Sequence, residues 1–357
     1  MKKKVIAGVL GAILIIGTVV STAGCSLATS SSKKTGESKY KYGKIQIPGK
    51  DGSLCGAPIY IAYENGYIAE EGFDVELISA DSETRKVGLN NGNIPIVNGD
   101  FQFFPSMEEG VETTVVDKLH NGCIKLVVKK GSKIKTAKDL KGKKIGVDEI
   151  GGTPYQVSSV WAEENGISAK QEDGQITFLP FSDGNLELQA LYKGEIDVAA
   201  MWDPLGSVAE KDGKVDVILD ISKDAPFNNR ACCFLYASTK VLKEKPDEIA
   251  ALLRAYRKAQ DFINQNPEKA VQTIIDGKYS QISDKELAVS LIKSYDYPSY
   301  KERATGKFDV KSDVTYFAKK LNEIKYLKTD ADQFTEQYYA QVDTKEDFDK
   351  LQKGDKK

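Results

Sequence analysis

From Gly43 to Ser238 the chain alternates short apolar runs with longer amphipathic stretches. The short runs have the length and β-branched content of strands, and they are KIQI (44–47), FDVELI (73–78), IPIV (94–97), TTVV (113–116), CIKLVV (123–128), KKIGV (143–147), QITFLPF (175–181), IDVAAMW (196–202), VDVILDI (215–221) and CCFLYAS (232–238). The stretches between them predict helices over Ala57 to Glu70, Thr153 to Asn165 and Leu186 to Tyr192, each followed by a glycine. This alternation predicts an α/β fold of mainly parallel sheets flanked by helices.

After Ser238 the pattern changes to helices only. Pro246 opens a stretch in which apolar residues recur at helical spacing until Pro267 interrupts it. Further helices are predicted over 269–275, 284–294 and 312–323. Residues 346–357 are mostly charged and predict a solvated tail.

Composition narrows the classes of partner. The 357 residues contain 50 Lys plus Arg against 52 Asp plus Glu, a formal net charge of −2. This balance provides no basic surface excess that would attract nucleic acid. The length supports about two domains, and we expect a monomer with no nucleic-acid partner.

The first 24 residues predict export. Lys2, Lys3 and Lys4 precede an uncharged run over 5–24, as in secretory signal peptides. The run ends in Thr-Ala-Gly-Cys25, which resembles the lipobox of bacterial lipoproteins, although Thr22 stands where leucine is usual. The resemblance implies a signal peptide over 1–24, lipid such as palmitate on Cys25, and anchoring to the outer face of the cell membrane. A flexible tether would follow over 25–42, and the alternative is an anchor helix that spans the membrane.

The chain lacks the common catalytic motifs. It has one histidine, His120, and no H-E-x-x-H, C-x-x-C, G-x-x-x-x-G-K-[ST] or G-x-S-x-G sequence. A dyad of His120 with Cys123 has no third group in the sequence to orient the base. We therefore predict no catalytic residues and a protein that is not an enzyme.

Four segments carry a family resemblance when they are taken together. They are AYENGYIAEEGFDVEL (62–77), KIKTAKDLKGKKIGV (133–147), LYKGEIDVAAMWDP (191–204) and LLRAYRKAQDFINQNPEKA (252–270). Their order resembles the extracellular solute-binding proteins of ABC importers, in the branch that includes sulfonate, nitrate, bicarbonate and thiamine-pyrimidine binding proteins. The resemblance implies a small-molecule ligand and, as partners, the ABC permease subunits of the cell membrane.

The same resemblance implies a periplasmic-binding-protein type II fold with two lobes and two crossover hinges. Lobe 1 would comprise 43–130 and a helical second part over 231–345, lobe 2 would comprise 131–230, and the charged tail would follow over 346–357. The ligand would lie between the lobes, which agrees with the rule that ligands of open parallel sheets bind outside the carboxyl ends of the strands.

Loops after the predicted strands supply the candidate ligand-binding residues. The resemblance points to Ser53, Asp100, Thr153 and Trp202, and the full candidate set is Ser53, Cys55, Asp100, Phe101, His120, Gly152, Thr153, Tyr155, Trp202, Asp203 and Arg230. A helix start at Gly152 and Thr153 would suit an anion, and Arg230 could bind an oxyanion with two hydrogen bonds. Each feature also has a structural interpretation: an ordinary strand-to-helix turn, a surface salt bridge and, for Trp202, hinge packing. The ligand is left open between a sulfonate-like organic anion and a pyrimidine-type heteroaromatic.

Four cysteines remain beyond Cys25, namely Cys55, Cys123, Cys232 and Cys233. Adjacent residues of a strand point to opposite faces, so Cys55, Cys123 and one of the vicinal pair could join His120 as ligands of a soft metal. Buried small side chains are the favoured interpretation, because the cysteines lack paired spacing. We therefore expect no cofactor and no metal. The alternative function is an enzyme similar to the iron-dependent thiamine-pyrimidine synthases, which carry a cysteine-rich run where this chain has Ala-Cys-Cys-Phe-Leu over 231–235.

Overall fold

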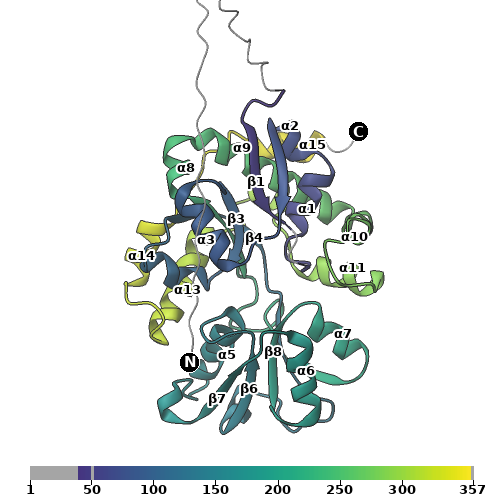
Figure 1. Ribbon diagram of the computed structural model, residues 1–357, viewed down its shortest axis with the longest axis vertical. Helices are drawn as coiled ribbons and strands as arrows, with labels where there is room; N and C mark the ends of the chain where they lie inside the picture. The colour runs from purple at the N-terminus through teal and green to yellow at the C-terminus, as the bar shows by residue number, and fades with distance from the viewer. Residues whose placement is uncertain (1–38, 50–51, 355–357) are drawn as a thin grey trace, which may run out of the picture. The chain divides into compact units, whose positions relative to one another are not determined.

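The structure is a computed structural model that describes residues 39–49 and 52–354 (Figure 1). The predicted signal peptide, Cys25 and the tether up to residue 38 lie outside the described residues. Residues 39–42 are described, and Tyr42 stacks on Phe73 with 4.7 Å between ring centroids. Among the described residues, no helix is long and apolar enough to cross a membrane.

The described strands form three sheets. They are β1 (Gly43–Pro48), β2 (Phe73–Ile78), β3 (Ile96–Asp100), β4 (Thr113–His120), β5 (Ile124–Lys129), β6 (Lys143–Val147), β7 (Ile176–Pro180), β8 (Val198–Trp202), β9 (Val215–Asp220) and β10 (Cys233–Ser238). The strand orders are β1-β2, β3-β10-β4 and β7-β6-β8-β5-β9. The first two sheets belong to lobe 1, which comprises residues 39–120 and 233–354. The five-stranded sheet forms lobe 2, residues 124–220.

Helices surround these sheets. They are α1 (Ala57–Glu64), α2 (Tyr67–Glu70), α3 (Ser82–Asn91), α4 (Phe103–Glu108), α5 (Thr153–Glu164), α6 (Gly184–Lys193), α7 (Leu205–Lys211), α8 (Thr239–Glu244), α9 (Pro246–Gln265), α10 (Pro267–Asp276), α11 (Lys285–Ser294), α12 (Tyr300–Ala304), α13 (Val310–Glu323), α14 (Ala331–Tyr338) and α15 (Phe348–Gly354), with short 3₁₀ turns η1 (Ala137–Leu140) and η2 (Gln171–Asp173). Helices α5, α6 and α7 lie around the lobe 2 sheet in Figure 1. The helices α8 to α15 confirm the helical pattern expected after Ser238. The helix expected over 57–70 is interrupted at Gly66, whose φ of 75° places it in the left-handed region.

The sheets are mixed rather than mainly parallel. The pairs β1-β2, β6-β7 and β6-β8 are parallel, whereas β5 and β10 run antiparallel to both of their neighbours. These two strands are the ones that the chain forms directly after it crosses from one lobe to the other. A strand that enters a sheet from the edge where the other strands end must run in the opposite direction, so the two crossings explain the mixed pairing.

The first crossing lies earlier than the predicted boundary at residue 130. The predicted boundary places the run over 123–128 in lobe 1, but this run forms β5, which pairs with β8 and β9 of lobe 2. The chain therefore leaves lobe 1 at residues 121–123. It returns between β9 and β10, an interval that contains the predicted boundary at residue 230.

The predicted tail is also partly structured. Glu346 is nearly buried and pairs with Arg257 at 2.7 Å, and the ring of Phe348 lies 6.0 Å from that of Tyr300. Arg257 also pairs with the buried Asp117 at 2.7 Å, and the charges of Arg257 and Arg303 lower the pKa of Asp117 to about 2 against the opposing effect of its burial. The sequence pattern did not predict helix α15 in this tail, because the charged residues of the helix outnumber its apolar ones.

A glycine in the first crossing provides a test of how tightly the two crossings pack. A Cβ atom on Gly122 would lie 2.5 Å from the backbone carbonyl carbon of Ile221 and 2.6 Å from the backbone nitrogen of Ser222. We expect Gly122→Ala to lower the stability by about 1–3 kcal/mol, the usual cost of overpacking, measured as a fall in the thermal midpoint.

The matched control is Gly206→Ala in α7, where the new Cβ would meet Val127 at an ordinary 3.4 Å. This change should leave the midpoint unchanged or raise it, because alanine is the better helix former. Equal midpoints for Gly122→Ala and wild type would show that the crossings are loosely packed.

Candidate functional site

The strand ends of both lobes meet at the crossings. Cys233, the first residue of β10, pairs with Asp100 at the end of β3 and with His120 at the end of β4. In lobe 2, Ile124 at the start of β5 pairs with Trp202 at the end of β8. The register of these strands therefore gathers polar, thiol and aromatic side chains in one region.

A cavity of about 260 Å³ opens at this point. It is lined by Ser53, Cys55, Ala80, Ser82, Arg85, Asn98, Gly99, Asp100, Gln102, Phe103, Trp202 and Cys233. Trp202 comes from lobe 2, and the other lining residues come from lobe 1. Predicted site residues that line the cavity are Ser53, Cys55, Asp100 and Trp202.

Arg85 is the cation among the described residues that line this cavity, and the sequence analysis missed it. It lies in the first turns of α3, and its guanidinium donates to the carbonyl of Ala80 at 3.1 Å and to the carbonyl of Asn98 at 2.9 Å. Helix α3 was not predicted because its polar sequence, SETRKVGLNN, buries only Gly88 and Leu89. The sequence signal for Arg85 is its position shortly after strand β2, because ligands of α/β sheets bind beyond the carboxyl ends of strands.

Asp100 joins the two lobes through a buried hydrogen bond. The hydroxyl of Thr153, at the start of α5, donates to its carboxyl group, and the backbone N–H of Gln102 donates at 3.1 Å. Burial raises the pKa of Asp100 to about 8, against the opposing effect of the Thr153 hydrogen bond. The carboxyl group is therefore mostly protonated at neutral pH and adds little negative charge to the cavity.

Trp202 forms the lobe 2 wall. Its indole Nε1 donates to Asp148 at 3.0 Å, which fixes the orientation of the ring. The ring also borders a second cavity of about 520 Å³, which Ser53, Asp203 and residues 281–284 line as well. Both cavities are therefore lined by Trp202 and Ser53. Among the residues that line the first cavity, Trp202 is the one that comes from lobe 2.

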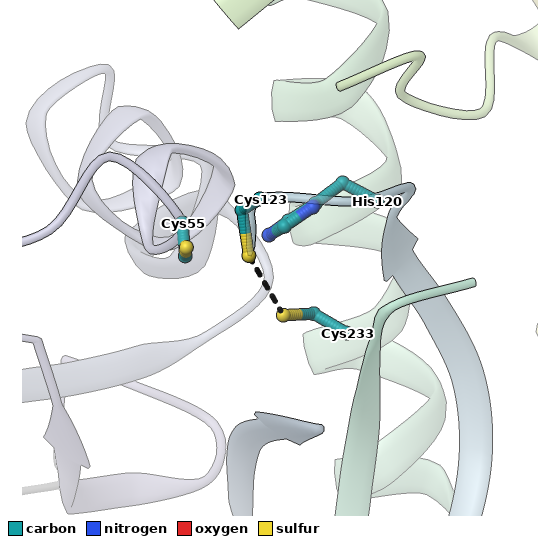
Figure 2. Close-up of side chains that lie close together, drawn as sticks. All are labelled: Cys55, His120, Cys123 and Cys233. Atoms are coloured by element: carbon teal, nitrogen blue, oxygen red, sulfur yellow. Dashed lines mark hydrogen bonds between the residues drawn. The ribbon is translucent and has the colours of Figure 1, made fainter. Parts of the chain in front are cut away.

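Beside the first cavity lies a cluster of three thiols and one imidazole. The Sγ atoms of Cys55, Cys123 and Cys233 and a ring nitrogen of His120 all lie within 4.8 Å of one another, and Figure 2 shows these side chains converging from separate segments. All four residues are buried. Hydrogen bonding from Cys123 lowers the pKa of the Cys55 thiol, whereas burial raises the pKa of Cys123.

The sequence comparison agrees with this architecture. The family described as NMT1/THI5 like matches residues 56–270, which is more than half of the chain. The chain belongs to the NMT1/THI5-like family.

Relatives of this NMT1/THI5-like protein include binding proteins. YtlA of Bacillus subtilis (strain 168), a proposed binding protein, is 21% identical over 262 residues, which cover 71% of this chain and 75% of that protein. The alkanesulfonate-binding protein SsuA of Xanthomonas axonopodis pv. citri, solved with MOPS, is 14% identical with a TM-score of 0.64 over 84% of this chain and 98% of that one. The periplasmic nitrate-binding protein NrtA of Synechocystis PCC 6803 is 14% identical with a TM-score of 0.62 over 83% and 85%. These structures confirm the predicted fold.

Two other predicted site residues of this NMT1/THI5-like protein, Phe101 and Arg230, have partners outside the first cavity. Phe101 is buried and stacks on Phe317 at 4.2 Å. Arg230 lies over the ring of Tyr316 at 3.7 Å and pairs with Asp313 at 3.4 Å. These contacts place Phe101 in the core of lobe 1 and Arg230 against α13.

Two further predicted residues belong to the packing of lobe 2. The ring of Tyr155 lies 4.4 Å from that of Phe178, and the carboxylate of Asp203 accepts from Lys125 at 2.8 Å. At the start of α5, a Cβ on Gly152 would lie 2.6 Å from an oxygen of Asp148. The protein's own carboxylate therefore lies at the helix start where an anion was expected.

A second buried carboxyl group lies near Asp148. Glu187 in α6 is 2% exposed, and its Oε1 has no hydrogen-bond partner among the described residues. Burial, with a smaller effect of the Asp148 charge, raises the pKa of Glu187 to about 8. The folded protein therefore holds a proton that the unfolded chain releases above about pH 4.3.

This proton predicts a pH dependence of stability. Because the pKa of Glu187 is raised on folding, its contribution to stability is complete below about pH 4 and is lost as the pH rises toward about 8. Glu187→Gln is neutral at every pH, so the variant should gain stability relative to wild type between pH 5 and pH 8.5, measured by thermal midpoints. The control Glu195→Gln changes an exposed carboxylate and should follow wild type. A parallel decline of Glu187→Gln and wild type would contradict the prediction.

Proposed function

We propose that this protein is a lipid-anchored solute-binding protein that captures a small organic anion between its lobes and delivers it to an ABC permease. The observation that carries the proposal is the cavity of about 260 Å³ that combines Arg85 of lobe 1 with Trp202 of lobe 2. Membership of the NMT1/THI5-like family and the likeness to sulfonate-binding and nitrate-binding proteins support it.

The lining of the cavity favours an anion with an organic portion. The guanidinium of Arg85 supplies positive charge and planar donors, and the mostly protonated Asp100 does not repel a negative ligand. The indole of Trp202 offers a flat apolar wall. Polar groups of Ser53 and Asn98 complete a lining in which a few polar atoms orient a ligand against apolar surface. A sulfonate with a short organic chain fits this chemistry better than an uncharged pyrimidine.

In the described part of the chain, few side-chain hydrogen bonds and ion pairs join the two lobes, which suits capture by closure. Besides the Thr153 hydroxyl on Asp100, Lys320 of lobe 1 pairs with Glu164 of lobe 2 at 2.8 Å, and Lys211 of lobe 2 pairs with Asp284 of lobe 1. The side chains of these ion pairs are partly exposed, so each pair contributes little to stability. A ligand that contacts Arg85 and Trp202 together would favour the closed arrangement by its higher affinity for that state.

The first test is a thermal-shift panel of short alkanesulfonates, nitrate, bicarbonate and an aminopyrimidine. A ligand at 100 times its Kd should stabilise the protein by about 2.7 kcal/mol, and we expect this from a sulfonate. Arg85→Gln should then weaken binding at least about tenfold, because a charge-assisted hydrogen bond contributes about 1.5–3 kcal/mol. Arg230→Gln is the matched control and should bind as wild type does. Equal losses in both variants, stabilisation by the pyrimidine alone, or recovery of a chemically altered solute would contradict the proposal.

Lipid anchoring at Cys25 is a separate prediction from the sequence. Expression of the full-length chain in a Gram-positive host should give a membrane-associated product that incorporates labelled palmitate. Cys25→Ser should abolish the label and release the protein or leave its signal peptide uncleaved, whereas Cys55→Ser should not. A wild-type product that stays full-length and unlabelled would favour the membrane-spanning anchor helix.

A further inference from the structure

The geometry points to a zinc site built by Cys55, His120, Cys123 and Cys233. This inference does not depend on the proposed solute, because the four residues form a ligand set of their own beside the first cavity. Their donor atoms lie within 4.8 Å of one another. A tetrahedron with zinc–sulfur bonds of about 2.3 Å has sulfur–sulfur edges of about 3.8 Å, and Cys123 Sγ already lies 4.0 Å from Cys233 Sγ. Small side-chain rotations would therefore bring the set to coordination geometry.

The imidazole of His120 provides an independent observation. The Nδ1 atom of this fully buried residue contacts the carbonyl oxygen of Asn121, which can only accept, so Nδ1 carries the hydrogen. The neutral ring then has its lone pair on Nε2, which has no hydrogen-bond partner among the described residues. Figure 2 shows the ring directed at the thiols of Cys123 and Cys233. A histidine held by one nitrogen with the other facing thiols has the arrangement that zinc-binding histidines show.

The donor set and its charge favour zinc over copper(I). Three thiolates and one imidazole match the four-coordinate Cys₃His sites of zinc. Binding of Zn²⁺ would release three thiol protons and leave a net charge of −1, whereas Cu⁺ would leave −2 in the same buried place, which costs more. Cys55 lies one residue before Gly56, the N-cap of α1, whose positive end favours a thiolate nearby.

Two features of the fold support a metal site at these four residues. Cys55 and Cys233 line the first cavity, so two of the four ligand residues border an open space. The strand register fixes two of the four ligands, because Cys233 and His120 are paired residues of β10 and β4. Cys123 follows His120 by three residues across the first crossing. The interpretation as buried filler explains the thiols, but it leaves a buried Nε2 without a partner, which is costly.

Cys232 lies beside the cluster but outside its ligand set. Its Sγ lies 3.7 Å from that of Cys123. Cys232 is as buried as Cys233 but is not one of the four clustered donors. It therefore serves as a matched control for the ligand cysteines.

The test uses the purified full-length protein in detergent with reductant, loaded with Zn²⁺, desalted and analysed for metal. We expect one zinc per chain, a higher thermal midpoint in the loaded protein, and visible absorption typical of tetrahedral thiolate coordination after exchange for Co²⁺. Cys123→Ser and Cys233→Ser should lower the affinity for zinc at least about tenfold, and Cys232→Ser should bind as wild type does.

Two measurements on the wild-type protein keep the test valid if a variant fails to fold, namely the zinc stoichiometry and the cobalt spectrum. Less than half a zinc per chain after loading, an octahedral cobalt spectrum, or equal losses in Cys232→Ser and Cys233→Ser would overturn the inference. A disulfide of Cys123 that persists in reductant and excludes zinc would overturn it too. Failure of the solute panel would leave the zinc result unaffected, so the two proposals fail separately.

Discussion

The double crossing between the two lobes is the constraint on which the rest of the structure depends. The crossings are joined by backbone hydrogen bonds, from Cys232 N–H to the carbonyl of His120 at 3.1 Å and from Ile221 N–H to the carbonyl of Ile124 at 3.2 Å. Because both segments pass through one place, the strands on either side must start and end there. This condition reverses β5 and β10 within their sheets and brings the ends of β3, β4 and β8 together.

Polar groups gathered at such a buried place need partners, since an unpaired buried polar atom costs free energy. The carboxyl group of Asp100 accepts a hydrogen bond from the hydroxyl of Thr153, and burial raises its pKa. Asn121 donates its backbone N–H to the carbonyl of Tyr295 at 2.7 Å. The ring of Tyr295 also stacks on His120 at 5.0 Å. The helical second part of lobe 1 thus covers the crossings and fixes the imidazole, which links the last third of the chain to the site.

The fold could be predicted from the sequence because hydrophobic periodicity and the order of the segments can be read without knowing any tertiary contact. The sequence pattern placed the first crossing too late, because the apolar run over 123–128 suits either sheet and only pairing decides between them. It names Arg230 as a candidate because this residue lies at the return crossover, and it does not consider Arg85. The side chain of Arg230 instead turns to Tyr316 of α13, about 86 positions later in the chain, and no local pattern reports such a contact. Likewise, the spacing of the cysteines gave no sign that strand register brings three of them to one histidine.

The cavity and the cysteine cluster have two residues in common, and this shared wall has a thermodynamic consequence. Cys55 and Cys233 line the cavity and also belong to the cluster. An ion held by their sulfur atoms would fix two side chains of the cavity lining, so the free energy of binding a solute against them would depend on whether the ion is bound. Linkage is reciprocal for binding free energies; a solute that packs against these sulfurs must therefore change the affinity for the ion by the same factor. The ends of β3, β4 and β8 meet at the crossings, so a solute and an ion bound there together would be coupled through Cys55 and Cys233, although each site can be tested alone.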